Sequence, residues 1–81
     1  MRIKLKGVKR VNITDDHIKL DALLKYASIA STGGEAKLMI QNGGVFVDGE
    51  PCTARGKKIR PGSVVRFGSD VLIVDKRYDR Q

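Results

Sequence analysis

The sequence predicts an α+β fold in which two short helices pack on a small, mostly antiparallel, twisted β-sheet. Three observations predict this class. With 81 residues, of which 41% are apolar, the chain can build one small core, so residues 1–81 are expected to form a single domain. Apolar residues recur at helical spacing between positions 20 and 40. Beyond position 45, short β-branched runs alternate with turn-forming pairs.

The chain is expected to be extended before the first helix. Apolar and polar residues alternate at positions 3–5 and again at 11–13, which indicates one or two short strands. Residues 14–19 include two aspartates and are expected to form a loop that leads into the helix.

The first helix is expected to begin at Leu20 and to end near Ser28, because apolar residues there have the spacing of one buried stripe. The stripe consists of Leu20, Leu23, Leu24 and Ala27. Asp21 and Lys25 lie four residues apart with the acid first, the favourable order for a helical ion pair. We therefore interpret Asp21 as a structural residue that holds either the helix start or Lys25.

A second helix is expected after a tight corner at residues 29–31. Thr32 and Glu35 have the spacing of a capping box, in which a hydroxyl and a carboxylate each accept a hydrogen bond from a backbone amide. The apolar stripe of this helix consists of Ala36, Met39 and Ile40. Gly43 and Gly44 can supply the left-handed conformation that ends a helix at little cost.

Strands are expected from residue 45 onward. Residues 45–47 and 50–52 flank Asp48-Gly49, a pair that tolerates the positive φ angles of a type I′ hairpin turn. Pro51 has no amide donor, so its strand should lie at the edge of a sheet.

A second hairpin is expected nearer the carboxyl end of the sequence. Pro61-Gly62 is typical of a type II turn. Residues 63–67 and 71–74 are apolar, β-branched runs joined by a short turn, and residues 75–81 are expected to form a polar, frayed tail.

The formal net charge of +7 is concentrated in two segments. Residues 1–10 and residues 55–66 each carry five cations and no acid, whereas residues 11–54 carry more acids than bases. This distribution favours a basic face that meets an anionic partner, with a plain solvated surface as the alternative. A membrane surface is disfavoured, because no helix combines a basic face with a large aromatic and apolar face.

Several classes of protein are not expected from this sequence. Cys52 is the only cysteine and His17 the only histidine, which disfavours an internal disulfide and a zinc cluster. The sequence has no run of about 18 apolar residues, so no membrane-spanning helix is expected. Residues 1–6 alternate charged with apolar groups, unlike a signal peptide. Because the sequence shows neither a catalytic constellation nor a Walker-type glycine loop, we expect a non-enzymatic intracellular protein without metal or cofactor.

Several short segments, taken in order, carry a family resemblance. They are Lys19-Leu20-Asp21, Ser31-Thr32-Gly33-Gly34-Glu35-Ala36, Ile40, Gly44-Val45, Val47-Asp48-Gly49 and Arg60-Pro61-Gly62-Ser63-Val64. From about Ile18 to Phe67 the chain resembles the S-four RNA-binding domain, named after small-subunit ribosomal protein four. Its Gly-Gly-Glu-Ala segment and the run Gly56-Lys57-Lys58 are most similar to the small stand-alone bacterial members. The resemblance implies an alpha-L motif, an L-shaped surface of two helices and a β-turn that holds structured RNA by its phosphates.

Two positions depart from the family pattern. Lys19 stands where many members have an arginine, so the charge is kept but the bidentate fork is lost. The segment Thr32-Gly33-Gly34 stands where many members have arginine and serine, which leaves backbone amides to contact phosphate.

The candidate RNA-binding residues lie at the two helix starts and in the basic run after residue 54. A helix start presents unpaired amides and a partial positive charge, which favour a phosphate oxygen. In a short strand alternating residues share a face, so Lys58 and Arg60 should project together while Ile59 turns inward. The set is Lys19, Lys25, Thr32, Gly33, Gly34, Lys37, Arg55, Lys57, Lys58 and Arg60, with Lys4, Lys6, Lys9 and Arg10 as accessory contacts. RNA binding requires them to converge beside the second helix start.

Each of these residues also has a plainer interpretation, in which Thr32 only caps its helix and the basic run is a solvated loop. Aromatic residues make up 5% of the chain, and only Tyr26, Phe46 and Tyr78 could stack on bases. This favours folded RNA over single strands. We expect a monomeric, non-catalytic protein that binds structured RNA, with ribosomal or transfer RNA in the bacterial cytoplasm implied by the resemblance. The alternative function is a basic adapter that docks on an acidic protein of the ribosome or the repair machinery.

Overall fold

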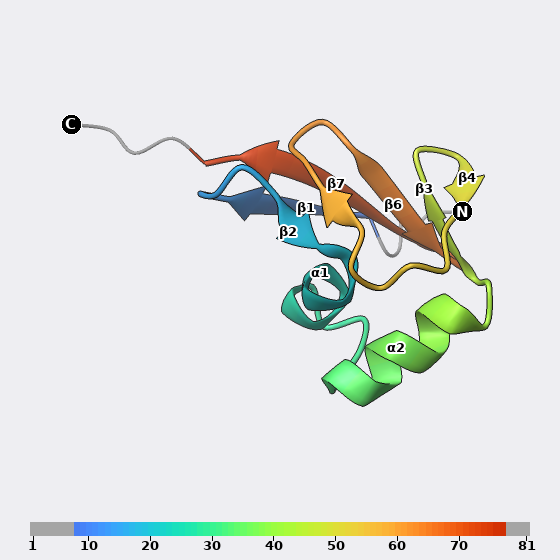
Figure 1. The fold of residues 1–81 in the computed structure, drawn as a ribbon. Coiled ribbons are helices and arrows are strands. Elements are labelled where there is room, and N and C mark those ends of the chain that lie inside the picture. Colours follow the sequence, from blue (N-terminus) through green and yellow to red (C-terminus); the bar gives the residue numbers. More distant parts are fainter. Residues whose placement is uncertain (1–7, 78–81) are drawn as a thin grey trace, which may run out of the picture.

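A computed structural model describes residues 8–77, and these residues form seven strands and two helices (Figure 1). The helices are α1 (Leu20–Tyr26) and α2 (Gly33–Gln41). The strands are β1 (Val8–Ile13), β2 (Ile18–Lys19), β3 (Val45–Val47), β4 (Glu50–Pro51), β5 (Lys58–Ile59), β6 (Val64–Phe67) and β7 (Asp70–Lys76).

Five of the strands form the main sheet, in the order β1-β7-β6-β3-β4. β1 pairs in parallel with β7, whereas the other neighbours pair antiparallel. β2 and β5 pair antiparallel in a separate two-stranded sheet. Pro51 lies in the edge strand β4, where its missing amide costs no ladder hydrogen bond. The predicted class, two helices on a mostly antiparallel sheet, is confirmed.

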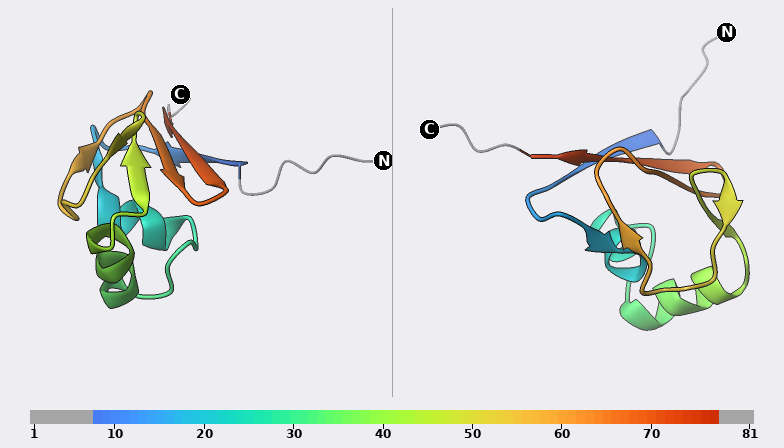
Figure 2. Two further views of the ribbon diagram at one scale, coloured as in Figure 1. Left: turned by 90° about the vertical axis from the view of Figure 1, so that its right-hand side faces the viewer. Right: turned by 45° about the horizontal axis from the view of Figure 1, so that its top comes forward.

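The two helices cover one face of the main sheet, and the core lies between the helices and that face (Figures 1 and 2). Strand residues alternate, so that every second side chain points to the helices. The core side chains with an exposed fraction of 2% or less are Leu20, Leu23, Leu24, Ala36, Ile40, Val45, Ile59, Val65, Leu72 and Val74. On the opposite face, the Arg66 guanidinium lies 5.3 Å from the centre of the Phe46 ring.

The helices follow the predicted apolar stripes. The leucines of α1 and Ala36 and Ile40 of α2 are buried, while Met39 packs against the core from a half-buried position. Asn42 is the C-cap of α2, and Gly43 follows it with a φ of 86°, the left-handed conformation expected there. Ser28, in the corner between the helices, also has a positive φ, of 64°.

Two of the predicted turns have the expected backbone angles. Asp48 and Gly49 have φ angles of 51° and 88°, as a type I′ turn requires, and Gly62 has a φ of 100°, as a type II turn requires. Asp48 also joins the two turns: its carboxylate accepts from the Val64 amide at 2.9 Å and from the Ser63 hydroxyl at 3.2 Å.

Two expectations about the ends of elements are wrong. Ile18 and Lys19 form a strand instead of the last part of a loop, because their backbone pairs with β5. β7 continues through Asp75 and Lys76, the first two residues of the expected frayed tail, because both pair with β1. Backbone pairing does not need apolar side chains, so the polar composition of these segments does not indicate that they form strands. The strand expected at residues 3–5 lies outside the described residues.

Candidate nucleic-acid interface

The basic run of residues 55–58 packs against the start of α1. The Leu20 amide donates to the Lys57 carbonyl at 2.9 Å, and the Asp21 amide donates to the Arg55 carbonyl at 3.1 Å. The next amide, that of Ala22, donates to the Asp21 carboxylate at 2.7 Å. The first amides of α1 are therefore satisfied by the protein itself, and the side chains of the basic run are left to face solvent.

Lys19 and Lys58 lie directly opposite each other in the two-stranded sheet. They are register partners in the antiparallel β2–β5 pair, and both are exposed. Their neighbours Ile18 and Ile59 are also partners, and Ile59 is fully buried in the core. The inward isoleucines thus hold two lysines side by side in solvent. Like charges directly opposite one another destabilise a sheet, so this arrangement favours an anionic ligand between them.

Five exposed cations lie in β2 and in residues 55–60, and we call them the basic cluster. Lys58 and Arg60 are exposed on either side of the buried Ile59, as the alternation predicted. Within residues 8–77, no side chain of the cluster makes an ion pair or a hydrogen bond. The cluster consists of Lys19, Arg55, Lys57, Lys58 and Arg60.

The start of α2 has the predicted cap, with one difference. The Glu35 amide donates to the Thr32 hydroxyl at 3.1 Å, while the Glu35 carboxylate accepts from the Ser31 amide at 2.6 Å instead of from that of Thr32. Gly33 and Gly34 are exposed, and nothing lies within 4 Å of a β-carbon built on Gly33. This helix start is open, but the Glu35 carboxylate offsets its partial positive charge.

The remaining candidates of the two helices are exposed but are not joined to the basic cluster by any contact described in residues 8–77. Lys37 lies one turn inside α2. Lys25 lies in the last turn of α1, at the end away from the cluster. The predicted pair of Asp21 with Lys25 is not among the ion pairs of the described residues, and Asp21 serves the helix start instead. In Figures 1 and 2 the chain from β4 to β5 runs on the same side of the molecule as α2.

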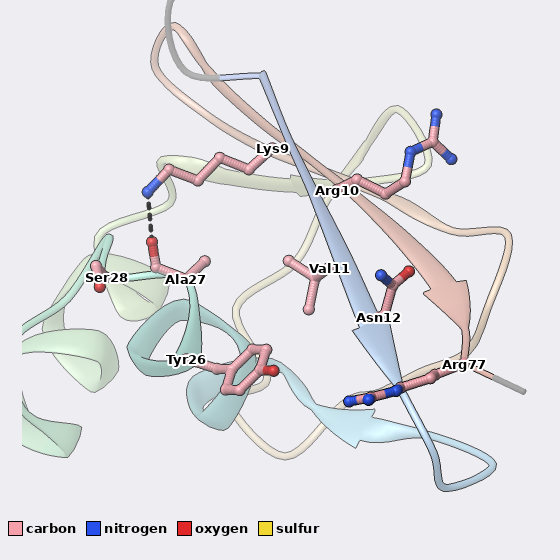
Figure 3. A pocket seen from close by; sticks show the side chains of 8 residues that line it. All are labelled: Lys9, Arg10, Val11, Asn12, Tyr26, Ala27, Ser28 and Arg77. Atoms are coloured by element: carbon pink, nitrogen blue, oxygen red, sulfur yellow. Dashed lines mark hydrogen bonds between the residues drawn. The ribbon is translucent and has the colours of Figure 1, made fainter. Parts of the chain in front are cut away.

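The accessory residues of β1 have partners inside the protein. The Lys9 ammonium donates to the Ala27 carbonyl at 2.7 Å, where it satisfies the end of α1 (Figure 3). Arg10, on the other face of the strand, forms an ion pair with Asp75. Both therefore contribute to the fold, and neither joins the basic cluster through a described contact. Lys4 and Lys6 lie outside the described residues.

The sequence did not indicate a hollow between β1 and the end of α1. It has a volume of about 570 Å³, and Tyr26 and Arg77 extend into it from opposite sides (Figure 3). Its lining residues come from the beginning, middle and end of the chain, so no local pattern could have revealed it. Among the described residues, no group of side chains is suited to hold a metal ion and no helix is long and apolar enough to cross a membrane.

Comparison with known proteins shows a family and a relative that this chain is similar to. The S4 domain, the family described above as S-four, matches residues 11–75. The probable ribosome maturation protein RlbA of Bacillus subtilis (strain 168) is 37% identical over 62 residues, which cover 73% of this chain and 87% of that protein. The matched range includes residues 11–13 of β1 and most of β7, and so extends beyond the segment from Ile18 to Phe67.

Proposed function

The chain belongs to the S4 domain family, whose members are RNA-binding domains, and on that premise we propose that its basic cluster binds the phosphates of structured RNA. The observation that carries the proposal is the pair of lysines held opposite each other in β2 and β5. An RNA phosphate between them would relieve their repulsion and would be held by two charges. Arg55, Lys57 and Arg60 extend the same charge, so the phosphates of a folded RNA can be contacted together.

Ribosomal RNA is the RNA that we propose, with transfer RNA as the alternative. The relative from Bacillus subtilis is described as a ribosome maturation protein, which supports a ribosomal target. The protein would act without catalysis: it would bind or hold a folded segment of RNA in the cytoplasm, as a monomer. Recognition would rest on shape and phosphate positions, because the cluster contains no aromatic side chain that could stack on a base.

The proposal is tested by crosslinking in cells. We expect the protein to crosslink to ribosomal RNA, and sequencing of the retained RNA identifies the segment. The double variant Lys57→Glu/Lys58→Glu should lose these crosslinks while its free energy of unfolding changes by less than about 1 kcal/mol, because both side chains are exposed. Arg66→Glu, which reverses a charge on the other face of the sheet, is the control and should keep the crosslinks.

The same experiment separates RNA binding from the adapter function. Complexes held by RNA are lost when the lysate is treated with ribonuclease, whereas a complex with an acidic protein survives. Crosslinks that persist after nuclease treatment, or that persist in the double variant, would contradict the proposal.

A further inference from the structure

A groove lies along the edge strand β1, at the opposite end of α1 from the basic cluster. Its larger part is the hollow of about 570 Å³ in Figure 3, and a second hollow of about 300 Å³ continues it toward His17. The two share Asn12, Tyr26 and Arg77, so these three residues lie at the middle of the groove. β1 borders it because, within residues 8–77, this strand pairs with β7 alone and its other edge has no partner strand.

The groove contains an aromatic side chain that the core does not use. Tyr26 is 65% exposed, whereas the leucines of α1 are fully buried, so burial in the core does not account for a tyrosine at this position. In Figure 3 its ring borders the hollow below Val11. An exposed aromatic face in a hollow is suited to stacking against a planar ligand.

The charge of the larger hollow is positive. Lys9, Arg10 and Arg77 line it, and none of its described lining residues is acidic, whereas Asp15 lines the smaller hollow. The charge of Arg10 is compensated by Asp75, and the Lys9 ammonium donates one hydrogen bond to the Ala27 carbonyl. Two further protons of Lys9 and the guanidinium of Arg77 remain for a ligand, since residues 8–77 offer them no carboxylate partner. A ligand that fits is planar at one end and anionic at the other.

We propose that this groove is a second RNA site, which takes one unpaired nucleotide. The base stacks on Tyr26, its phosphate lies near Arg77 and Lys9, and the Asn12 amide, which can donate and accept, meets the edge of the base. The nucleotide must be unpaired because a base within a duplex has both faces covered. This inference rests on the proposed function and adds a base contact to the phosphate contacts of the basic cluster.

The length of α1 is compatible with one RNA that occupies both sites. The basic cluster lies at the start of this helix and Tyr26 is its last residue. Seven residues at 1.5 Å each give about 10 Å along the helix axis. A duplex on the basic cluster could therefore place the first nucleotide beyond its end in the groove.

Two RNA probes test the second site: a blunt stem-loop, and the same stem-loop with a 3′ overhang of adenosines. We expect the overhang to tighten binding by the wild-type protein roughly 5- to 140-fold, the range for stacking of one base. Tyr26→Ala should abolish this gain and leave binding of the blunt stem-loop unchanged. Tyr26→Phe, which keeps the aromatic face, should keep the gain. Leu38→Ala, at a side chain 61% exposed on α2, is the matched control and should also keep it.

A second measurement follows the fluorescence of the wild-type protein and needs no variant that lacks the aromatic ring. The chain has no tryptophan, so its fluorescence comes from tyrosine, and stacking should quench the emission of Tyr26. We expect the overhang probe, and not the blunt one, to quench the wild-type protein, and Tyr26→Phe to lose this quenching. If the wild-type protein binds both probes equally and shows no quenching, the second site is wrong while the basic cluster stands. If it binds neither probe, both proposals fail.

Discussion

At the scale of single residues, the feature with the largest consequence is the repulsion between Lys19 and Lys58. Natural strand pairs place opposite charges or apolar groups opposite each other, because like charges there cost stability. In this protein the buried Ile59 determines the register, and the register determines that the two lysines face each other. The pair is therefore unfavourable for the isolated protein and favourable for binding an anion.

This gives a prediction for Lys58→Glu. The variant should be more stable than the wild type by about 0.2–1 kcal/mol, because an opposite-charge pair with Lys19 replaces a like-charge pair. Its affinity for RNA should fall, and the slope of log affinity against log salt should become shallower by about one. Chemical denaturation and an RNA titration on the same sample measure both effects.

Arg66→Glu is the matched control for this prediction, since it makes the same change of charge on the outer face of the sheet. It should leave RNA binding nearly unchanged. If Lys58→Glu instead loses stability together with affinity, the two lysines do not face each other as described.

Local sequence patterns identified some residues of the site and missed the partners of others. The Thr32 cap was predictable because its acceptor and donor lie three residues apart. The facing of Lys19 and Lys58 was not, because strands of two residues have no periodicity and these two lie 39 positions apart in sequence. For the same reason the sequence predicts Lys9 only as an accessory RNA contact and does not indicate its bond to the Ala27 carbonyl.

At the scale of elements, the backbone and the side chains of the basic run of residues 55–58 have different roles. Its backbone carbonyls cap α1, whereas its side chains form part of the basic cluster. The helices and hairpins were predictable because each has its own stripe or turn pair. The pairing of β2 with β5, which brings the basic run to the helix, was not, because it depends on contacts between distant segments.

The backbone angles on either side of β5 predict different changes in the free energy of unfolding for substitutions of two glycines. Gly56 has a negative φ and open space around it, so Gly56→Ala should leave the free energy of unfolding unchanged or raise it by up to about 1 kcal/mol. Gly62 has a φ of 100°, so Gly62→Ala should lower it by about 1 kcal/mol or more. Thermal or chemical denaturation of the two variants checks this. Equal losses would contradict the backbone conformation described for the turn.

At the scale of the whole molecule, the described cations of the two basic segments differ in their contacts. Residues 55–60 supply four of the five cations of the basic cluster, whereas Lys9 and Arg10 bond to the end of α1 and to Asp75. The net charge of +7 therefore overstates the charge that one RNA can meet at the cluster. The sequence predicted a charged face but could not assign each cation to the face or to the fold.

A salt titration counts the cations that meet RNA. If about four to six phosphates are neutralised, the slope of log affinity against log salt should be about −3 to −5. The double variant Lys57→Glu/Lys58→Glu should bring this slope about two units closer to zero, provided that residual binding is measurable. A slope near zero in the wild-type protein would show that binding is not electrostatic, which would contradict a phosphate-binding surface.

The pairing of β2 with β5 has a consequence for how binding and folding depend on each other. Since the facing lysines come from opposite halves of the chain, the site does not exist until both halves have come together. An RNA bound there would bind only the folded state and would therefore stabilise it against unfolding. This stabilisation would grow with the logarithm of the free RNA concentration. The protein should thus withstand heat best while it carries its RNA, and should be least robust immediately after release.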